Sequence, residues 1–330
     1  MLKNIKYIIT TLLIISFVAA CSSDKDIEKG KENVLRLGIT QNDKNSEYEA
    51  LLQFKEGVEE RTNNEIKVET YHSDQLANVP DLIEQASVGT NVGTITDAAQ
   101  LGDIKKEFSI LQSPFTFENT NEIDKFLDSN LYQTWIDEFN EEGLQVLSFN
   151  FKLGDRNLAT TKEVTSADEL RGKVIRTSGA DIVDKTIETM GGAPSGMPWT
   201  EAYPGLEQGV IDGVEAHSSA IYESSMYEVI GHIAKTNHYQ LVSSLVVSAA
   251  WFNELSEEHK EIVIEEAIKA GDLATELSEE QTKEYEKEMK ELGVEFHDVD
   301  RDEFKKLTDG LYDEIGLSEV RSQVLEVLDK

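Results

Sequence analysis

The chain opens on alternating strand-type and helix-type patterns, and this order limits the folds open to it. Residues 34–39 alternate as a strand, residues 46–62 have apolar side chains spaced for one buried helix face, and residues 66–71 alternate again. A short helical pattern at 80–88 and a β-branched segment at 92–96 follow. This βαβαβ order predicts a parallel or mixed sheet flanked by helices.

Similar patterns continue to the end of the chain. We expect helices at 121–126, 131–139, 181–190 and 221–230, and strands at 144–149, 173–177 and 211–214. Residues 239–251 are nearly all apolar or small, which predicts a long buried strand crossing from one sheet to another. The charged helical run at 256–292, at about 1.5 Å per residue, is long enough to extend beyond one domain.

The amino terminus has the pattern of a bacterial lipoprotein signal. Lys3 and Lys6 precede a short apolar segment, and the small residues 18–20 lead to Cys21, the one cysteine of the chain. The segment resembles a lipobox, which implies cleavage after residue 20 and acylation of Cys21, so that acyl chains attach the protein to the membrane outside the cytoplasm. The alternative is an ordinary cleaved signal with a chance cysteine. An acylated Cys21 leaves no disulfide, so the fold depends on its core.

Composition separates a tether from the folded part and limits the partners. Residues 21–33 are polar and typical of a flexible tether from lipid to domain. The formal net charge is −33, and removal of Lys3 and Lys6 takes it to −35. Such a field repels nucleic acid and anionic headgroups, so binding through a basic patch is excluded.

Signatures of enzymes and metal sites are missing from the sequence. It has no GxSxG, HExxH, P-loop or GxGxxG motif, and a lipidated Cys21 would leave no thiol for catalysis. The six histidines have no tight ligand spacing; His232 and His238 are the nearest pair, and we interpret them as structural rather than as metal ligands. We therefore expect neither an enzyme nor a cofactor or metal.

Arginine is the informative residue type. The chain has seven, and Arg156, Arg171 and Arg176 fall within 21 residues. Guanidinium groups bind carboxylates bidentately, so an arginine fixed in a cleft can capture an organic acid. The alternative is pairing with the protein's own acidic surface, which we favour for Arg171.

An ordered set of motifs resembles the solute-binding proteins of tripartite ATP-independent periplasmic (TRAP) transporters. It comprises LRGKVIRT at 170–177, GAPSGMPWTEAY at 192–203, LEQGVIDGVE at 206–215, YEV at 227–229 and TNH at 236–238, together with the earlier SEY at 46–48 and QL at 75–76. The resemblance extends from residue 34 to the end.

The resemblance implies a two-domain α/β clamshell, like other periplasmic binding proteins, with hinge strands and a long domain-spanning helix. We expect domain I at 34–153 and 242–281, and domain II at 154–241 and 282–330. It further implies a monomer that closes on a small organic acid and delivers it to the membrane permease of a TRAP transporter.

The resemblance also nominates site residues. Arg176 stands where the family has its principal arginine, which pairs with the ligand carboxylate, and Arg156 where several members have a second. Trp199 has the position of a ring that covers the ligand, with a role as a core tryptophan as the alternative. Asp97 and Thr40 stand at positions of the first domain that face the cleft. We interpret Tyr203 and Asp212 as scaffold.

One departure concerns the ligand. Where the family commonly has Glu-Asn-Pro, this chain has Glu215-Ala216-His217, so the asparagine donor is missing. His217 is a candidate replacement that would titrate near pH 6–7, with a packing role as the alternative. Dicarboxylates, sugar acids and sialic-acid-like ligands all fit an arginine, and Pro198-Trp199 is similar to members that bind ectoine. A module that presents ligand to a membrane sensor is a further alternative.

Overall fold

The computed structural model describes residues 33–330, and residues 34–330 form one compact unit. The predicted signal peptide, Cys21 and all but the last residue of the tether lie outside the described residues. Within 33–330, no helix combines the length and the apolar character needed to cross a membrane.

One sheet combines four strands from the amino-terminal half with β10 from the second half, in the order β2-β1-β3-β10-β4. Its strands are β1 (Asn33–Gly38), β2 (Ile66–Tyr71), β3 (Val92–Asp97), β4 (Leu144–Asp155) and β10 (Gln240–Ser248). β1 and β3 are parallel, as the βαβ order predicts, whereas β10 runs antiparallel between β3 and β4. We call this sheet and its helices the first lobe; the helices are α2 (Ser46–Arg61), α3 (Val79–Ser87), α4 (Ala98–Gly102), the 3-10 helix η2 (Lys106–Gln112), α5 (Thr120–Leu127), α6 (Asn130–Glu138) and α11 (Ala249–Asn253).

A second sheet has six strands in the order β11-β9-β5-β8-β6-β7. They are β5 (Asn157–Thr160), β6 (Val174–Thr177), β7 (Ala193–Gly196), β8 (Gly213–Ala216), β9 (His232–Lys235) and β11 (Glu295–Asp298). Together with its helices it forms the second lobe; these are α7 (Ala167–Leu170), α8 (Asp181–Met190), α9 (Trp199–Glu207), α10 (Ser218–Glu223), the 3-10 helix η3 (Met226–Glu228) and α13 (Arg301–Thr308). Two short helices, α14 (Leu311–Glu314) and α15 (Ser318–Val327), end the chain.

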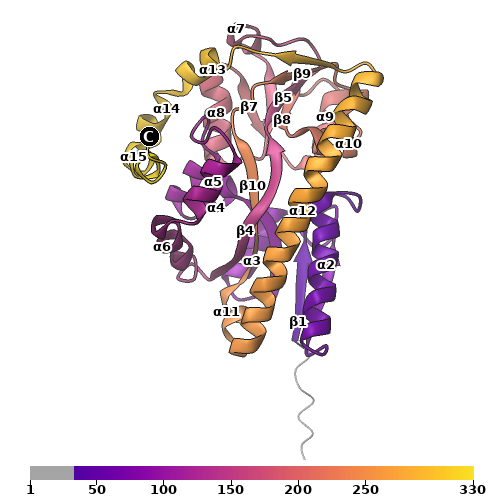
Figure 1. The fold of residues 1–330 in the computed structure, drawn as a ribbon. Coiled ribbons are helices and arrows are strands. Elements are labelled where there is room, and N and C mark those ends of the chain that lie inside the picture. The colour runs from indigo at the N-terminus through magenta and orange to yellow at the C-terminus, as the bar shows by residue number, and fades with distance from the viewer. Residues whose placement is uncertain (1–32) are drawn as a thin grey trace, which may run out of the picture. The chain divides into compact units, whose positions relative to one another are not determined.

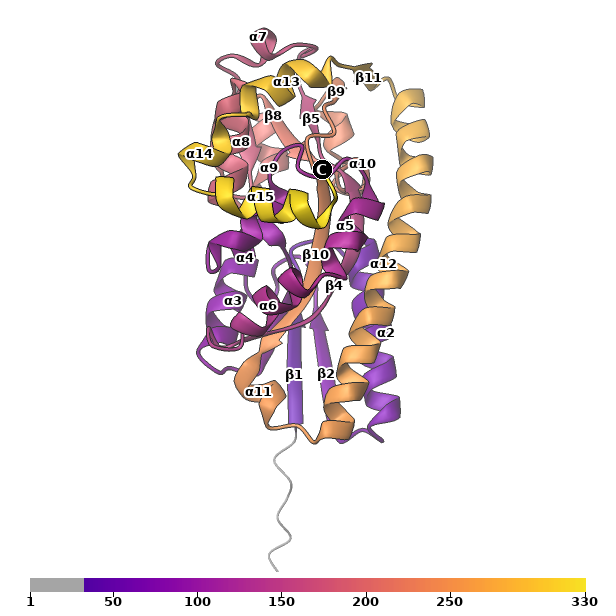
Figure 2. The ribbon, with the colours of Figure 1, turned by 60° about the vertical axis from the view of Figure 1, so that its left-hand side comes forward.

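The lobes are joined by strands and by one helix. β4 leads directly into β5, and β9 leads back into β10, so two neighbouring antiparallel strands cross between the sheets, with Gln240 opposite Asp155 at the crossing. The 35-residue helix α12 (Glu257–Glu291), capped by Ser256, runs along both lobes and is about 53 Å long at about 1.5 Å per residue. It packs against α2 and β4 in the first lobe and against α10 in the second (Figures 1 and 2). The predicted chain crossings and long helix are therefore confirmed.

Some predicted elements differ from the structure. The strand expected at 239–251 ends at Ser248, and α11 follows, because the pair Ala249-Ala250 favours helix over sheet. Of the four-residue strands, the patterns predicted β6 and β8 but missed β5, β7, β9 and β11, which contain few β-branched or aromatic residues and so have little strand signal of their own. The helical segment expected at 221–230 is two short helices, α10 and η3.

Two separate clusters of buried apolar side chains form the core of the first lobe. Phe54, Leu37 and Trp251 belong to one cluster of the first lobe, while Phe108 belongs to a second, aromatic-rich cluster. The second cluster also contains Val324 of α15, so the carboxyl terminus packs on the first lobe. The division into domains at the limits given above stays a proposal. It assigns α14 and α15 to the second domain, whereas Tyr312 of α14 and Val324 of α15 pack in this cluster of the first lobe.

Candidate functional site

A cavity of about 610 Å³ lies between residues of the two lobes. Its size is within the roughly 300–1,000 Å³ typical of small-molecule sites. It is lined by residues that include all six predicted ligand contacts: Thr40, Asp97, Arg156, Arg176, Trp199 and His217. The structure thus brings together residues that are up to 177 positions apart in the sequence.

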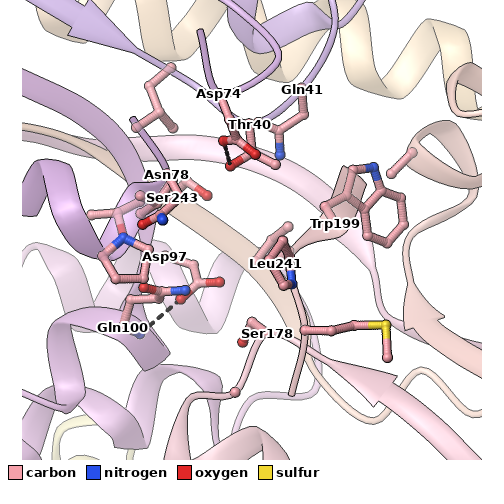
Figure 3. Close-up of a pocket in the computed structure, with 18 of the residues that line it drawn as sticks. Thr40, Gln41, Asp74, Asn78, Asp97, Gln100, Ser178, Trp199, Leu241 and Ser243 are labelled. Atoms are coloured by element: carbon pink, nitrogen blue, oxygen red, sulfur yellow. Dashed lines mark hydrogen bonds between the residues drawn. The ribbon is translucent and has the colours of Figure 1, made fainter. Parts of the chain in front are cut away.

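The cavity lies where strands end. Thr40 lies two residues after the end of β1, and Asp97 is the last residue of β3. In the second lobe, Arg176 is next to the last residue of β6, and His217 directly follows β8. The carboxyl ends of strands are the usual ligand-binding edge of α/β sheets, because loops and helix starts converge there. Figure 3 shows Asp97 and Trp199 on opposite sides of this cavity.

Arg176 has the environment expected of an anion-binding group. It is 6% exposed, and its Nε and Nη2 donate to the carbonyl oxygen of Met197 at 3.0 and 2.8 Å. The Trp199 ring lies 5.1 Å from the guanidinium carbon. Burial lowers the pKa of Arg176 to about 10, so the group stays charged at neutral pH. Within residues 33–330 this guanidinium forms no salt bridge, so no carboxylate contacts this buried positive charge.

Arg156 lines the cavity, as predicted, and already has a carboxylate partner within the protein. Its Nε and Nη2 donate to the two carboxylate oxygens of Glu215 at 2.7 and 2.5 Å, and Nη2 also donates to the Glu215 carbonyl at 2.8 Å. Tyr239 donates a further hydrogen bond to Glu215. Although burial opposes its charge, Glu215 holds the pKa of Arg156 above its ordinary value. The ion pair neutralises Arg156, so Arg176 is the guanidinium available to an incoming anion.

The prediction that His217 titrates near pH 6–7 is wrong. His217 is 3% exposed, and burial together with the charge of Arg156 lowers its pKa to about 3. Its Nδ1 lies 3.3 Å from Nη1 of Arg156. Because a guanidinium has only donors, Nδ1 accepts and the proton is on Nε2. The neutral ring therefore offers a donor at Nε2.

The other predicted contacts also line the cavity and bond to their neighbours. Thr40 donates to Asp74 at 2.8 Å, and Asp97 accepts from the backbone N–H of Gln100 at 2.9 Å (Figure 3). Burial raises the pKa of Asp97. Trp199 begins α9 and donates from Nε1 to Ser224 at 2.9 Å, so its ring both packs on the core of the second lobe and lines the cavity.

The residues interpreted as scaffold lie outside the cavity lining. Asp212 accepts from the backbone N–H of Val174 at 2.8 Å, and Tyr203 donates to Glu228. Arg171 is exposed and pairs with Asp168 at 3.1 Å, as favoured from the sequence.

Sequence reasoning missed acidic residues of the first lobe. Glu47 and Asp74 line the cavity, and Oε2 of Glu47 is buried with no hydrogen-bond partner among the described residues. Burial, reinforced by the charge of Glu223, raises the pKa of Glu47 to about 8. Glu223 accepts from Asn45 at 2.5 Å across the two lobes. Glu47 falls in the SEY motif, but among 64 acidic residues a carboxylate gives no signal of its own.

Two glycines shape the wall beneath Arg176. Gly179 has φ +85°, which favours glycine, and a Cβ on Gly196 would lie 2.9 Å from the Cα of Gly179. This close approach brings the loop after β6 against the end of β7, beside Met197 and Trp199.

Comparison with known proteins places the chain in a family. The model of bacterial extracellular solute-binding proteins, family 7 (DctP), matches residues 37–319. A TRAP periplasmic solute-binding protein of Escherichia fergusonii, solved in an apo open form, is 34% identical with a TM-score of 0.79 and covers 89% of this chain and 99% of its own. The corresponding protein of Ochrobacterium anthropi with bound L-fuconate is 30% identical, with a TM-score of 0.85 over 90% and 99% of the two chains.

A third similar structure comes from Chromohalobacter salexigens. This TRAP solute-binding protein with bound D-glucuronate is 28% identical with a TM-score of 0.84, over 89% of this chain and 99% of its own. The two lobes therefore form the α/β clamshell of these binding proteins, with hinge strands and a domain-spanning helix. The chain belongs to the bacterial extracellular solute-binding proteins of family 7, the DctP-type binding proteins of TRAP transporters.

Proposed function

We propose that this protein captures a sugar acid by a salt bridge between the ligand carboxylate and Arg176. The observation that supports the proposal is the buried charge of Arg176, which has no carboxylate partner among the described residues and lines the cavity. A buried guanidinium without a counter-charge is unfavourable by about 3–5 kcal/mol, so a carboxylate that enters the cavity removes this penalty. Closure of the lobes then follows binding.

The cavity wall supports a ligand rich in hydroxyl groups. The carboxyl oxygens of Glu47, Asp74 and Asp97 accept hydrogen bonds from such hydroxyls, whereas the second carboxylate of a simple dicarboxylate would meet acceptors instead of donors on this wall. L-fuconate and D-glucuronate, bound to the similar proteins above, are sugar acids. Ala216 cannot supply the missing asparagine donor, and the Nε2–H of His217 takes that role in this proposal.

A second candidate ligand is a zwitterionic solute, such as an ectoine-like compound. The buried, unpartnered carboxylate oxygen of Glu47 favours it, because a ligand cation would complement that oxygen while Arg176 holds the carboxylate. A cationic group in the cavity would also lower the pKa of Glu47 from about 8.

The proposal extends to the protein's place in the cell. The ligand is released chemically unchanged to a TRAP permease rather than to a sensor, and the protein acts as a monomer. It is held outside the cytoplasm by acyl chains on Cys21 and by the tether, which lie outside the described residues.

A ligand screen and one pair of arginine variants test this function. Thermal-shift measurements against uronates, aldonates, dicarboxylates and ectoines should give their largest rise in Tm with a sugar acid, since a ligand at about 100 times its Kd adds about 2.7 kcal/mol of stability. By calorimetry, Arg176→Ala should lower the affinity for that ligand about 100-fold or more, because the salt bridge is lost.

Arg171→Ala is the matched control, because Arg171 is exposed and paired with Asp168. It should leave affinity unchanged. Equal affinity of Arg176→Ala and the wild type, or a best ligand without an acid group, would overturn the proposal.

A further inference from the structure

Two histidines from distant parts of the chain meet on the edge of the second sheet. His232 begins β9 and His297 lies in β11, the edge strand next to it. His232 and His238 are the nearest histidines in the sequence, but they do not face each other in the structure. His238 is instead buried beside Thr236 and Glu215. His232, Glu295 and His297 instead place one ligand atom each within 4.8 Å of the others.

The strand register explains why these side chains converge. β9 and β11 are parallel, and Glu295 lies opposite His232. His297 follows two residues later, so it projects from the same face of the sheet as Glu295. Phe296, between them, projects from the other face, where Lys235 and Lys290 lie 5.5 and 4.7 Å from its ring centroid.

The nitrogen geometry is close to that of a metal site. Nδ1 of His232 lies 3.1 Å from Nε2 of His297. Two imidazoles that bind one zinc ion tetrahedrally, with Zn–N near 2.0–2.1 Å, hold their nitrogens about 3.3 Å apart. Small side-chain adjustments would therefore admit the ion in place of the proton that the two nitrogens now share.

A fourth residue orients one of these rings. Oε1 of Glu163 lies 3.7 Å from Nδ1 of His297. The negative charge on that side favours the proton on Nδ1 and leaves the lone pair of Nε2 facing His232. A shift of the Glu163 side chain by less than about 1 Å would give the carboxylate–histidine hydrogen bond that is usual beside zinc-binding histidines. Glu163 and Glu295 also bring negative charge to this edge of a chain whose net charge is −33.

We infer that His232, Glu295 and His297 bind a divalent cation of the Zn²⁺ class, with solvent completing the coordination. Two imidazoles and one carboxylate favour Zn²⁺ over Mg²⁺ or Ca²⁺, which prefer oxygen ligands. None of the three residues lines the ligand cavity, so the site is separate from the proposed sugar-acid site. The ion would fasten β11, which pairs with β9 alone, at the point where the chain returns from α12 to the second sheet.

Calorimetric titration of the metal-stripped full chain with ZnCl₂ tests the inference. We expect saturable binding at one ion per chain, a rise in Tm with added ZnCl₂, and no competition from excess MgCl₂. His232→Ala and His297→Ala, on different strands, should each weaken this binding at least tenfold and abolish the rise in Tm.

His259→Ala is the matched control, because His259 lies 3.8 Å from a carboxylate oxygen of Glu65 but has no second histidine beside it. It should bind Zn²⁺ as the wild type does. Absence of saturable binding to the wild type, or equal binding by a folded His297→Ala variant, would overturn the inference. Circular dichroism in chelator establishes that each variant is folded.

Discussion

Burial affects the ionisable residues near the cavity differently: the two arginines stay charged, whereas His217 is neutral and two carboxyl groups have raised pKa values. Glu215 offsets the charge of Arg156, whereas Arg176 has hydrogen bonds to a carbonyl and a ring face but no counter-charge. Neutral His217 accepts from Arg156 on one nitrogen. Where the lobes meet, Glu47 of the first lobe and the partly buried Glu223 of the second have few donors, and burial raises their pKa values to about 8 and about 7.

These two carboxyl groups predict a pH dependence of stability. Their pKa values in the folded protein exceed the ordinary value of 4.5, because burial disfavours the charged form. The folded state therefore binds more protons than the unfolded state, and its stability falls as the pH rises from about 5 to about 8. We expect Glu223→Gln to reduce this fall by on the order of 3 kcal/mol, at about 1.4 kcal/mol per pKa unit.

Urea unfolding of the ligand-free protein between pH 5 and 8 measures the effect. The negative net charge adds a slope of the same sign, so the difference between variant and wild type is the informative quantity. Glu279→Gln, on the exposed side of α12, should keep the wild-type slope. The same slope in Glu223→Gln would contradict the prediction.

At the level of elements, Gly93 allows β3 to pack closely against β10. Gly93 of β3 lies opposite Val247 of β10 and next to Leu37 of β1. A Cβ at Gly93 would lie 2.4 Å from the carbonyl oxygen of Val246 and 2.9 Å from Leu37 Cδ2. The backbone oxygen belongs to β10, which is paired with β3 on one side and β4 on the other, so it cannot move without disturbing the ladder.

Gly93→Ala should therefore destabilise the protein by about 1–3 kcal/mol, the usual cost of overpacking. Urea unfolding gives the difference. Gly310→Ala is the control, since Gly310 has φ −81° and open space around its Cβ position, and its effect should stay within about 0.5 kcal/mol. A Gly93→Ala variant as stable as the wild type would show that β10 can shift.

At the scale of the whole molecule, net charge opposes folding. Most ion pairs of the described residues are exposed and stabilise the protein by about 0–1 kcal/mol each. The self-repulsion of a chain with net charge −33 acts between many groups at longer distances. Salt weakens both the attraction within the surface ion pairs and the self-repulsion of the net charge. We expect the self-repulsion to be the larger of the two free energies.

The Tm should consequently rise with NaCl between about 0.01 and 1 M, as the Debye length shrinks from about 30 to about 3 Å. Differential scanning calorimetry at pH 8 measures the rise. Repetition at pH 5, where Glu47 and Glu223 are protonated, should give a smaller rise. A Tm that falls with NaCl would mean that the surface pairs outweigh the repulsion.

Local patterns were enough to predict much of the fold. The order of β1, α2, β2, α3 and β3 was predicted within a few residues, because each element has a period that its own side chains define. The crossing strand and α12 were predicted for the same reason. In the second sheet, β6 and β8 were predicted near their observed positions, whereas β5, β7, β9 and β11 were missed, since pairing with neighbours rather than local pattern makes them strands.

The sequence by itself determined the residue types at the site, namely the arginines, Trp199 and the loss of the asparagine before His217. The tertiary structure alone decided their states: it paired Arg156 with Glu215, left Arg176 without a counter-charge and made His217 neutral. It also brought Glu47 to the cavity and His297 to His232. The physical reason is that charge and protonation depend on how deeply a side chain is buried and on partners far apart in the chain. A local sequence pattern contains neither the burial nor the partners.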